Sequence, residues 1–174
     1  MRRALPWLLG IALGAGVVHV AAVAALPRAI MSRVFTGFTA QAAPNQFVHP
    51  PLATHESRTI VRPSPDLAYS SAVFDVSARP LRVVVPLSAP YTSLSGFAAN
   101  TDNFFALNDQ TAGADPIDVV IVGPSTARSG LEGQRVIEAP SDRGVLLVRR
   151  VVVSADVFAA VDAVRKQART EPLR

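Results

Sequence analysis

An uncharged apolar run, from Ala4 to Pro27, follows the first three residues and constrains this chain more than any other feature. A helix over Ala4–Leu26 would span about 34 Å, which exceeds the ~30 Å hydrocarbon core of a bilayer. Its Leu, Ile and Val side chains favour insertion by about 3–6 kcal/mol in total, and a charged His19 would cost at most about 3.5 kcal/mol. The run predicts an N-terminal transmembrane helix, and we assign residues 1–28 to a membrane anchor.

Two fates of this anchor segment stay open. The small residues Ala22–Ala24 fit a signal-peptide cleavage site, although the apolar run is longer than the roughly 7–15 residues of a usual signal core. A retained signal anchor would keep Arg2 and Arg3 in the cytoplasm and place the rest in the periplasm, in a single pass through a bacterial inner membrane. The opposite orientation is the alternative, because Arg28 and Arg33 balance the N-terminal arginines.

Gly10 and Gly14 form a G-x-x-x-G pair within the anchor. Small residues at this spacing let two helices approach closely. A helix–helix dimer through these glycines is therefore an expected partner beside the membrane lipid bilayer. The alternative is the ordinary glycine content of bacterial anchors.

The composition narrows the chemistry of the rest of the chain. The 174 residues contain no cysteine, which excludes disulfides, thiolate metal sites and a cysteine nucleophile. The net charge is +4, but no basic cluster with interleaved aromatics accompanies it, so we expect no nucleic-acid partner. With 49% hydrophobic residues the chain is expected to fold rather than stay disordered.

Residues 29–65 are predicted to form a juxtamembrane helix and a proline-rich linker. Apolar residues recur at helical spacing over Ala29–Gln41, and they are Ile30, Met31, Val34, Phe35 and Phe38. This helix would lie either on the bilayer or against the folded domain. The stretch Pro44–Pro65 is rich in proline, which is typical of irregular structure.

Residues 66–174 are predicted to form a β-rich domain with a C-terminal helix. Turn signals separate short β-rich runs at 67–76, 81–86, 91–97, 103–107, 117–122 and 144–153. This spacing indicates a mainly β (α+β) chain with an antiparallel β-sandwich-like domain, or a barrel. The closing helix begins after Ser154 as N-cap and should cover a face or edge of the sheet. Its expected inner stripe is Val157, Phe158, Val161 and Val164.

Standard catalytic and phosphate-binding motifs are missing from the sequence. His49, His55 and Glu56 are metal-ligand types, but they lie in a proline-bounded stretch, and solvated surface is the preferred interpretation. We therefore assign no catalytic residue, no metal and no cofactor, and we lean against an enzyme while leaving that question open.

Arg149 and Arg150 are adjacent within a predicted strand, so their side chains point to opposite faces of the sheet. One of them then faces the core and needs a partner, for which Asp66 and Asp75 are candidates. The alternative is a strand end at which both arginines reach solvent.

Several sequence blocks follow one another between residues 64 and 153. They are Ser64–Ser71 (SPDLAYSS), Val83–Pro86 (VVVP), Tyr91–Leu94 (YTSL), Thr101–Asp109 (TDNFFALND), Asp118–Pro124 (DVVIVGP) and Arg150–Val153 (RVVV). In this order they resemble the bacterial family called domain of unknown function 1254, in its short membrane-anchored form.

The resemblance implies a β-sandwich-like module. It also implies that a separate chain supplies a second module, of the 1214 type, which longer relatives carry themselves. The family pattern maps onto Asp66, Tyr69, Asn103 and Arg150, and we expect these to converge in a polar binding cluster under or beside the sheet.

The favoured interpretation is a membrane-anchored envelope protein of unknown biochemical activity, with an interaction or structural role beside a partner chain. The alternative is a small-molecule-binding or hydrolytic module that uses the polar cluster. A cluster in an open pocket would favour the alternative, and a sealed, fully paired cluster would favour the structural role.

Overall fold

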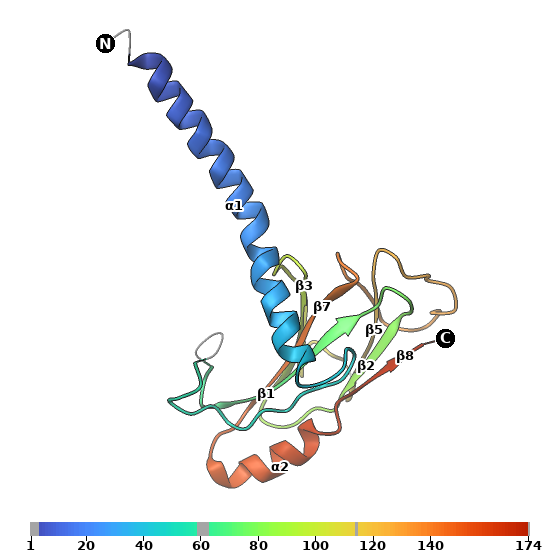
Figure 1. Ribbon diagram of the computed structural model, residues 1–174. Helices are drawn as coiled ribbons and strands as arrows, with labels where there is room; N and C mark the ends of the chain where they lie inside the picture. Colours follow the sequence, from blue (N-terminus) through green and yellow to red (C-terminus); the bar gives the residue numbers. More distant parts are fainter. Residues whose placement is uncertain (1–3, 59–62, 114, 174) are drawn as a thin grey trace.

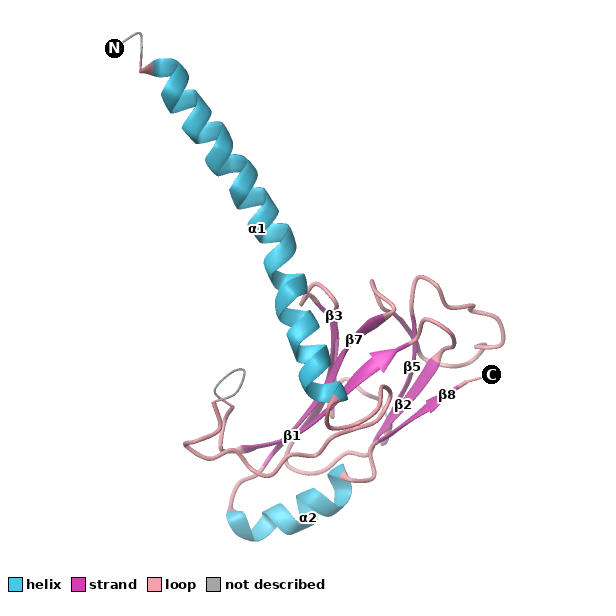
Figure 2. Cartoon of the chain, viewed as in Figure 1, coloured by secondary structure: helices cyan, strands magenta, loops and turns pink. Residues whose placement is uncertain are grey.

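The computed structural model describes residues 4–58, 63–113 and 115–173 (Figures 1 and 2). Arg2 and Arg3, which enter the orientation argument, lie outside the described residues. The elements in chain order are α1 (Leu5–Thr39), β1 (Leu67–Asp75), β2 (Leu81–Val85), β3 (Thr92–Ala98), β4 (Asn103–Asn108), β5 (Ile117–Val122), β6 (Val136–Glu138), β7 (Arg143–Val151), α2 (Ala155–Arg165) and β8 (Arg169–Pro172).

Helix α1 is one continuous helix, where the sequence suggested an anchor followed by a separate juxtamembrane helix. It continues past Pro27 and extends away from the β-strands along most of its length (Figure 1). Its apolar side chains are exposed, with Trp7 and Leu13 at 76% and 73%. By length and composition α1 is able to cross a membrane.

The strands form two four-stranded sheets. The first sheet has the order β1-β7-β3-β4 and is antiparallel throughout, and the second has the order β6-β5-β2-β8. In the second sheet β6 runs parallel to β5 and the other pairs are antiparallel. The expected mainly β fold with an N-terminal and a C-terminal helix is confirmed, and the pairing of the described strands is mostly antiparallel, with β5 and β6 as the parallel pair.

The inner faces of the two sheets share one apolar core, because alternate residues of each strand point to the same side. Large inward side chains come from both sheets, namely Phe74, Leu94 and Leu146 from the first and Leu81, Ile117 and Ile121 from the second. Part of the outer side of the second sheet is also buried, because Leu131 covers Val120 and Val122 of β5.

Helix α2 covers the edge of the first sheet where β1 begins. Its Val161 is buried with Ala68 and Val152, and Phe158 and Leu52 pack against them. Ser154 is the N-cap residue as expected, although its side chain makes no capping hydrogen bond. The chain does not close with this helix, because the short polar strand β8 follows and pairs with β2.

The last turns of α1 pack on the outer face of the first sheet. Met31 is buried with Val73 of β1 and Val145 of β7, and Phe35 and Phe38 pack against this cluster. Of the two positions expected for the apolar stripe of residues 29–41, the structure shows the one against the domain.

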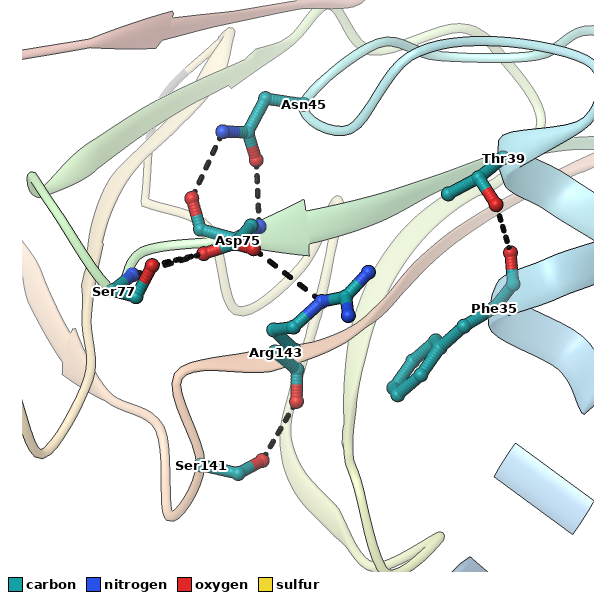
Figure 3. A network of polar contacts seen from close by, with 7 residues as sticks. All are labelled: Phe35, Thr39, Asn45, Asp75, Ser77, Ser141 and Arg143. Atoms are coloured by element: carbon teal, nitrogen blue, oxygen red, sulfur yellow. Dashed lines mark hydrogen bonds and ion pairs between the residues drawn. The ribbon is translucent and has the colours of Figure 1, made fainter. Parts of the chain in front are cut away.

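A polar network surrounds this junction between α1 and the sheet (Figure 3). The Asp75 carboxylate lies 3.3 Å from Arg143 Nε and accepts a 2.6 Å hydrogen bond from the Ser77 hydroxyl. The Asn45 side chain bonds the backbone N–H and C=O of Asp75 at 2.8 and 2.9 Å. The Arg143 guanidinium lies 5.3 Å from the centre of the Phe35 ring, so one arginine links the strand end to the helix.

Gly144 and Gly37 offer a matched test of how tightly the first sheet is packed. A Cβ atom at Gly144 would collide with the Phe97 carbonyl oxygen and the Phe74 ring, whereas one at Gly37 meets nothing within 4 Å. We expect Gly144→Ala to lower the free energy of unfolding by about 1–3 kcal/mol or more, and Gly37→Ala, in an exposed helix, to raise it by up to about 1 kcal/mol.

Chemical denaturation of both variants in detergent measures these changes. Equal stabilities would contradict the close approach of β7 to β3 and Phe74.

Candidate functional site

The four residues expected to form a polar cluster do not converge. In the β1–β7 ladder Ala68 pairs with Arg150 and Tyr69 pairs with Arg149, so Tyr69 and Arg150 point to opposite faces of the first sheet. Asn103 pairs with Phe97 near one end of β3, whereas Arg150 pairs with Thr92 at the other end.

Asp66 is exposed and lies just ahead of β1. Whether any of the four predicted residues binds a ligand stays a prediction.

Arg150 is the inward arginine that the strand pattern predicts. It is fully buried, whereas Arg149 on the outer face is half-buried. Neither expected partner reaches it, because Asp75 pairs with Arg143 and the hydrogen bonds found for Asp66 are made by its backbone.

The Arg150 guanidinium is bonded instead to main chain. Its Nη2 donates to the Pro86 carbonyl at 2.7 Å, and Nε and Nη1 have no hydrogen-bond partner among the described residues. Burial, with a further contribution from the charge of Arg165, lowers the pKa of Arg150 to about 10. The guanidinium is therefore a weakly compensated buried charge rather than half of a buried ion pair.

Arg165 is a second buried arginine, and it joins three segments. Its Nε donates to the Asp162 carboxylate at 2.6 Å, and Nη1 donates to the carbonyls of Pro50 and Tyr69 at 2.8 and 2.9 Å. It thereby ties α2 to the edge strand β1 and to the proline-rich segment. Sequence analysis overlooked this role, although the i, i+3 spacing of Asp162 and Arg165 offered a signal.

His49 completes this inner polar region. Its Nδ1 lies 2.8 Å from the Ser70 hydroxyl, and its ring stacks on Phe47 with centroids 6.2 Å apart. Burial, and then the charges of Arg165 and Arg150, hold the pKa of His49 below its usual value.

The other metal-ligand types lie apart from this region. His55 and Glu56 are exposed and 3.8 Å from each other. Within the described ranges, no group of three or more His, Asp or Glu side chains is placed to hold a metal.

An apolar cavity of about 480 Å³ lies on the outer face of the first sheet. Its floor contains Tyr69, Ser71, Val145 and Leu147 from β1 and β7. Val34 and Phe38 of α1 form one wall, and Pro50, Pro51, Leu52 and Ala53 of the proline-rich segment form another. Tyr69 is thus the one predicted site residue that lines this cavity.

A second cavity, of about 520 Å³, lies on the outer face of the second sheet beside Arg82, Asp118 and Arg135. Arg82 forms a bidentate pair with Asp118 at 2.9 and 2.5 Å, and its hydrogen bonds hold the pKa of Asp118 below the usual value. Arg135 donates to the Ala112 carbonyl at 2.9 Å. Arg82 and Asp118 thus compensate each other and Arg135 is bound to main chain, so the apolar cavity is the stronger candidate site.

Comparison with known proteins gives a family and two similar folds. The family described as "Protein of unknown function (DUF1254)" matches residues 44–172. The VPA0106 protein from Vibrio parahaemolyticus superposes with a TM-score of 0.65 at 17% identity, over 90% of this chain and 38% of that one. A putative uncharacterized protein from Burkholderia cenocepacia gives a TM-score of 0.50 at 18% identity, over 84% of this chain and 40% of that one.

At these identities the two structures establish a shared fold and nothing more. The chain spans about two fifths of the length of each of them. A comparison with curated proteins yields no match.

Substitutions at the two buried arginines should differ in cost. We expect Arg150→Met to lower the free energy of unfolding by no more than about 1 kcal/mol, because an apolar side chain of similar length removes a poorly compensated charge. Arg165→Met should cost about 3 kcal/mol or more, since two buried carbonyls lose their donor at about 1–3 kcal/mol each.

Denaturant titration of both variants measures the difference. A loss at Arg150→Met as large as at Arg165→Met would show that Arg150 is fully compensated in the folded protein.

His49 should make folding stability depend on pH. Its pKa is lowered in the folded state, so below about pH 6.5 the unfolded chain binds the proton more readily, and stability falls as the pH drops toward the folded-state pKa. The His49→Asn variant should lose this part of the pH dependence, whereas His55→Asn, at an exposed histidine, should retain it.

The unfolding midpoint between pH 5 and pH 8, measured for all three proteins, checks this. Identical profiles for the wild type and His49→Asn would contradict it.

Proposed function

We propose a function from the premise that the chain belongs to the DUF1254 family of proteins of unknown function. In this proposal it is a single-pass protein of a bacterial inner membrane. Its β-domain lies in the periplasm, is held rigidly on the anchor helix, and acts as an interaction module for a partner chain. The continuity of α1 from its exposed apolar part into the packed junction is the observation that carries the proposal.

The exposed part of α1 supports a membrane location. Large apolar residues from Leu5 to Ile30 lie more than half exposed, and none of the described β-strands covers them. Exposure of so much contiguous apolar surface to water is unfavourable, and a bilayer removes this cost.

The junction supports a rigid connection. Apolar packing around Met31, the Arg143–Phe35 contact and the Asp75 network all join α1 to the first sheet. A flexible linker would let the β-domain tumble, but here the helix fixes both its distance from the bilayer and its orientation. A fixed orientation suits a domain that presents one surface to a partner.

The proposal includes two partners. One is a chain that carries a β-module of the 1214 type, as the family resemblance implies, and the other is a second copy of this chain. Within α1, a Cβ added at Gly10 or Gly14 would meet nothing within 4 Å, which leaves this face of the helix open to a second copy.

The alternative function is a small-molecule-binding module. It rests on the apolar cavity beside α1, because Tyr69 and Arg150 face opposite sides of the first sheet and Asn103 lies at the other end of β3.

Membrane attachment is tested in cells that express the full chain. We expect the wild type to stay with the membrane after alkaline carbonate and to be released by detergent. Leu13→Arg combined with Val17→Arg should move it to the soluble fraction, because each arginine near the helix centre costs about 2.5–3.5 kcal/mol. The control Val136→Arg, at an exposed site on β6, should change nothing. Wild-type protein that is soluble without detergent would contradict the proposal.

The same cells can report the orientation and the partner. Because the chain has no cysteine, a membrane-impermeant maleimide added to intact spheroplasts should label Ser129→Cys, in the exposed loop before β6. It should label Ala4→Cys only after lysis. Reversed labelling would place the β-domain in the cytoplasm, and affinity purification that recovers the chain alone would contradict a partner chain.

A further inference from the structure

We propose that the apolar cavity beside α1 binds the alkyl chain of a single-chain anionic amphiphile, of the fatty-acid type, which the adjacent bilayer supplies. The inference deepens the proposed function and rests on its membrane location. It assigns a ligand class to a site made by α1, the proline-rich segment and the outer face of the first sheet.

The lining of the cavity suits an alkyl chain. Phe38, Leu52, Val145 and Leu147 contribute carbon surface from three separate segments. The volume of about 480 Å³ lies within the ~300–1,000 Å³ typical of small-ligand sites. An apolar space of this size between protein elements favours an apolar guest over water, which needs polar partners.

The floor of the cavity has a polar end. The Tyr69 hydroxyl oxygen accepts a 3.0 Å hydrogen bond from the Ser64 N–H, and no described residue accepts its proton, which can therefore be donated to a ligand. Arg149 does not itself line the cavity, but it is directly opposite Tyr69 in the β1–β7 ladder and points to the same face, with Cβ atoms about 4.5–5.5 Å apart as in such pairs.

The charge of Arg149 gives this end its specificity. Arg149 is half-buried, and among the described residues it makes no side-chain hydrogen bond and no ion pair. A phenol proton and an uncompensated guanidinium on one face match a carboxylate or a similar anionic head group. The geometry therefore places the head group at Tyr69 and Arg149, and the tail against Val145 and Phe38.

The position of the cavity along α1 identifies the bilayer as the source. At ~1.5 Å per residue, Val34 and Phe38 lie about 12 and 18 Å beyond Leu26, where the apolar run ends. The head-group layer extends roughly 5–8 Å beyond the hydrocarbon core, so the cavity begins just above it. No acidic residue precedes Glu56 in the sequence, so no carboxylate on α1 opposes the approach of an anionic amphiphile.

Photolabelling of the full chain in vesicles tests the proposal. The vesicles contain phosphatidylethanolamine and phosphatidylglycerol, with a fatty acid that carries a diazirine on its alkyl chain, and labelled peptides are located by mass spectrometry. We expect labels in the peptides that contain Leu52 and Leu147, in addition to those along residues 5–26 that any transmembrane helix would acquire.

Variants of the cavity separate its tail site from its head site. Leu147→Trp fills the space and should reduce labelling of the domain to background while residues 5–26 remain labelled. Arg149→Gln should reduce labelling by the fatty acid but leave labelling by the corresponding neutral diazirine alcohol unchanged. Val157, which was expected on the inner stripe of α2, is instead exposed, so the matched control Val157→Trp should label as the wild type does. Unfolding midpoints confirm that each variant is folded.

Labelling of the wild type confined to residues 5–26 would overturn this inference and leave membrane anchoring intact. Equal loss of both probes in Arg149→Gln would overturn the anionic head group. If the chain is instead recovered in the soluble fraction, the proposed membrane location has failed. Titration of the soluble full chain with dodecanoate then tests whether the cavity binds an alkyl chain. Binding that Leu147→Trp abolishes would support the site, and no binding would overturn it.

Discussion

The antiparallel ladder between β1 and β7 decides which side chains of the first sheet face the core and which face α1. Because neighbouring residues of a strand face opposite sides, the pairing of Ala68 with Arg150 turns that arginine toward the core and turns Tyr69 outward. The inner face then joins the second sheet in a shared core, and the outer face receives α1. A shift of one residue would exchange the two faces and leave neither the core nor the helix junction intact.

Two arginines, Arg150 and Arg165, are buried at one end of this ladder. Main-chain carbonyls accept most of their hydrogen bonds, and a carboxylate accepts from Arg165 alone. Arg165 satisfies the edge of β1 and the proline-rich segment, so its charge contributes to docking of α2. Arg150 has a single carbonyl, from Pro86, and its lowered pKa records the incomplete compensation. The contribution of a buried arginine to stability therefore depends on the hydrogen-bond acceptors around it, even when the degree of burial is the same.

Periodicity and turn signals predicted the six long strands and α2, because their apolar residues recur with the period of a strand or helix. Strands β6 and β8 were not predicted, because three or four residues are too few to show a period, and both strands are stabilised by pairing with β5 and β2. The inward direction of Arg150 was predictable from its neighbour, but its partner was not, because a backbone carbonyl leaves no trace in the sequence. The apolar cavity was equally hidden, as residues such as Val34 and Leu147 look like ordinary core positions until three segments meet.

Helix α1 continues without a break past Pro27 and packs on the first sheet, and this continuity has a mechanical consequence. A helix whose hydrophobic length exceeds the local bilayer thickness adjusts by tilting. The last turns of α1 pack against the first sheet (Figure 2). In the proposed membrane location, a tilt of α1 would therefore swing the whole β-domain. If the proposed membrane location holds, the thickness of the bilayer therefore sets the angle at which the loops of the β-domain meet their surroundings.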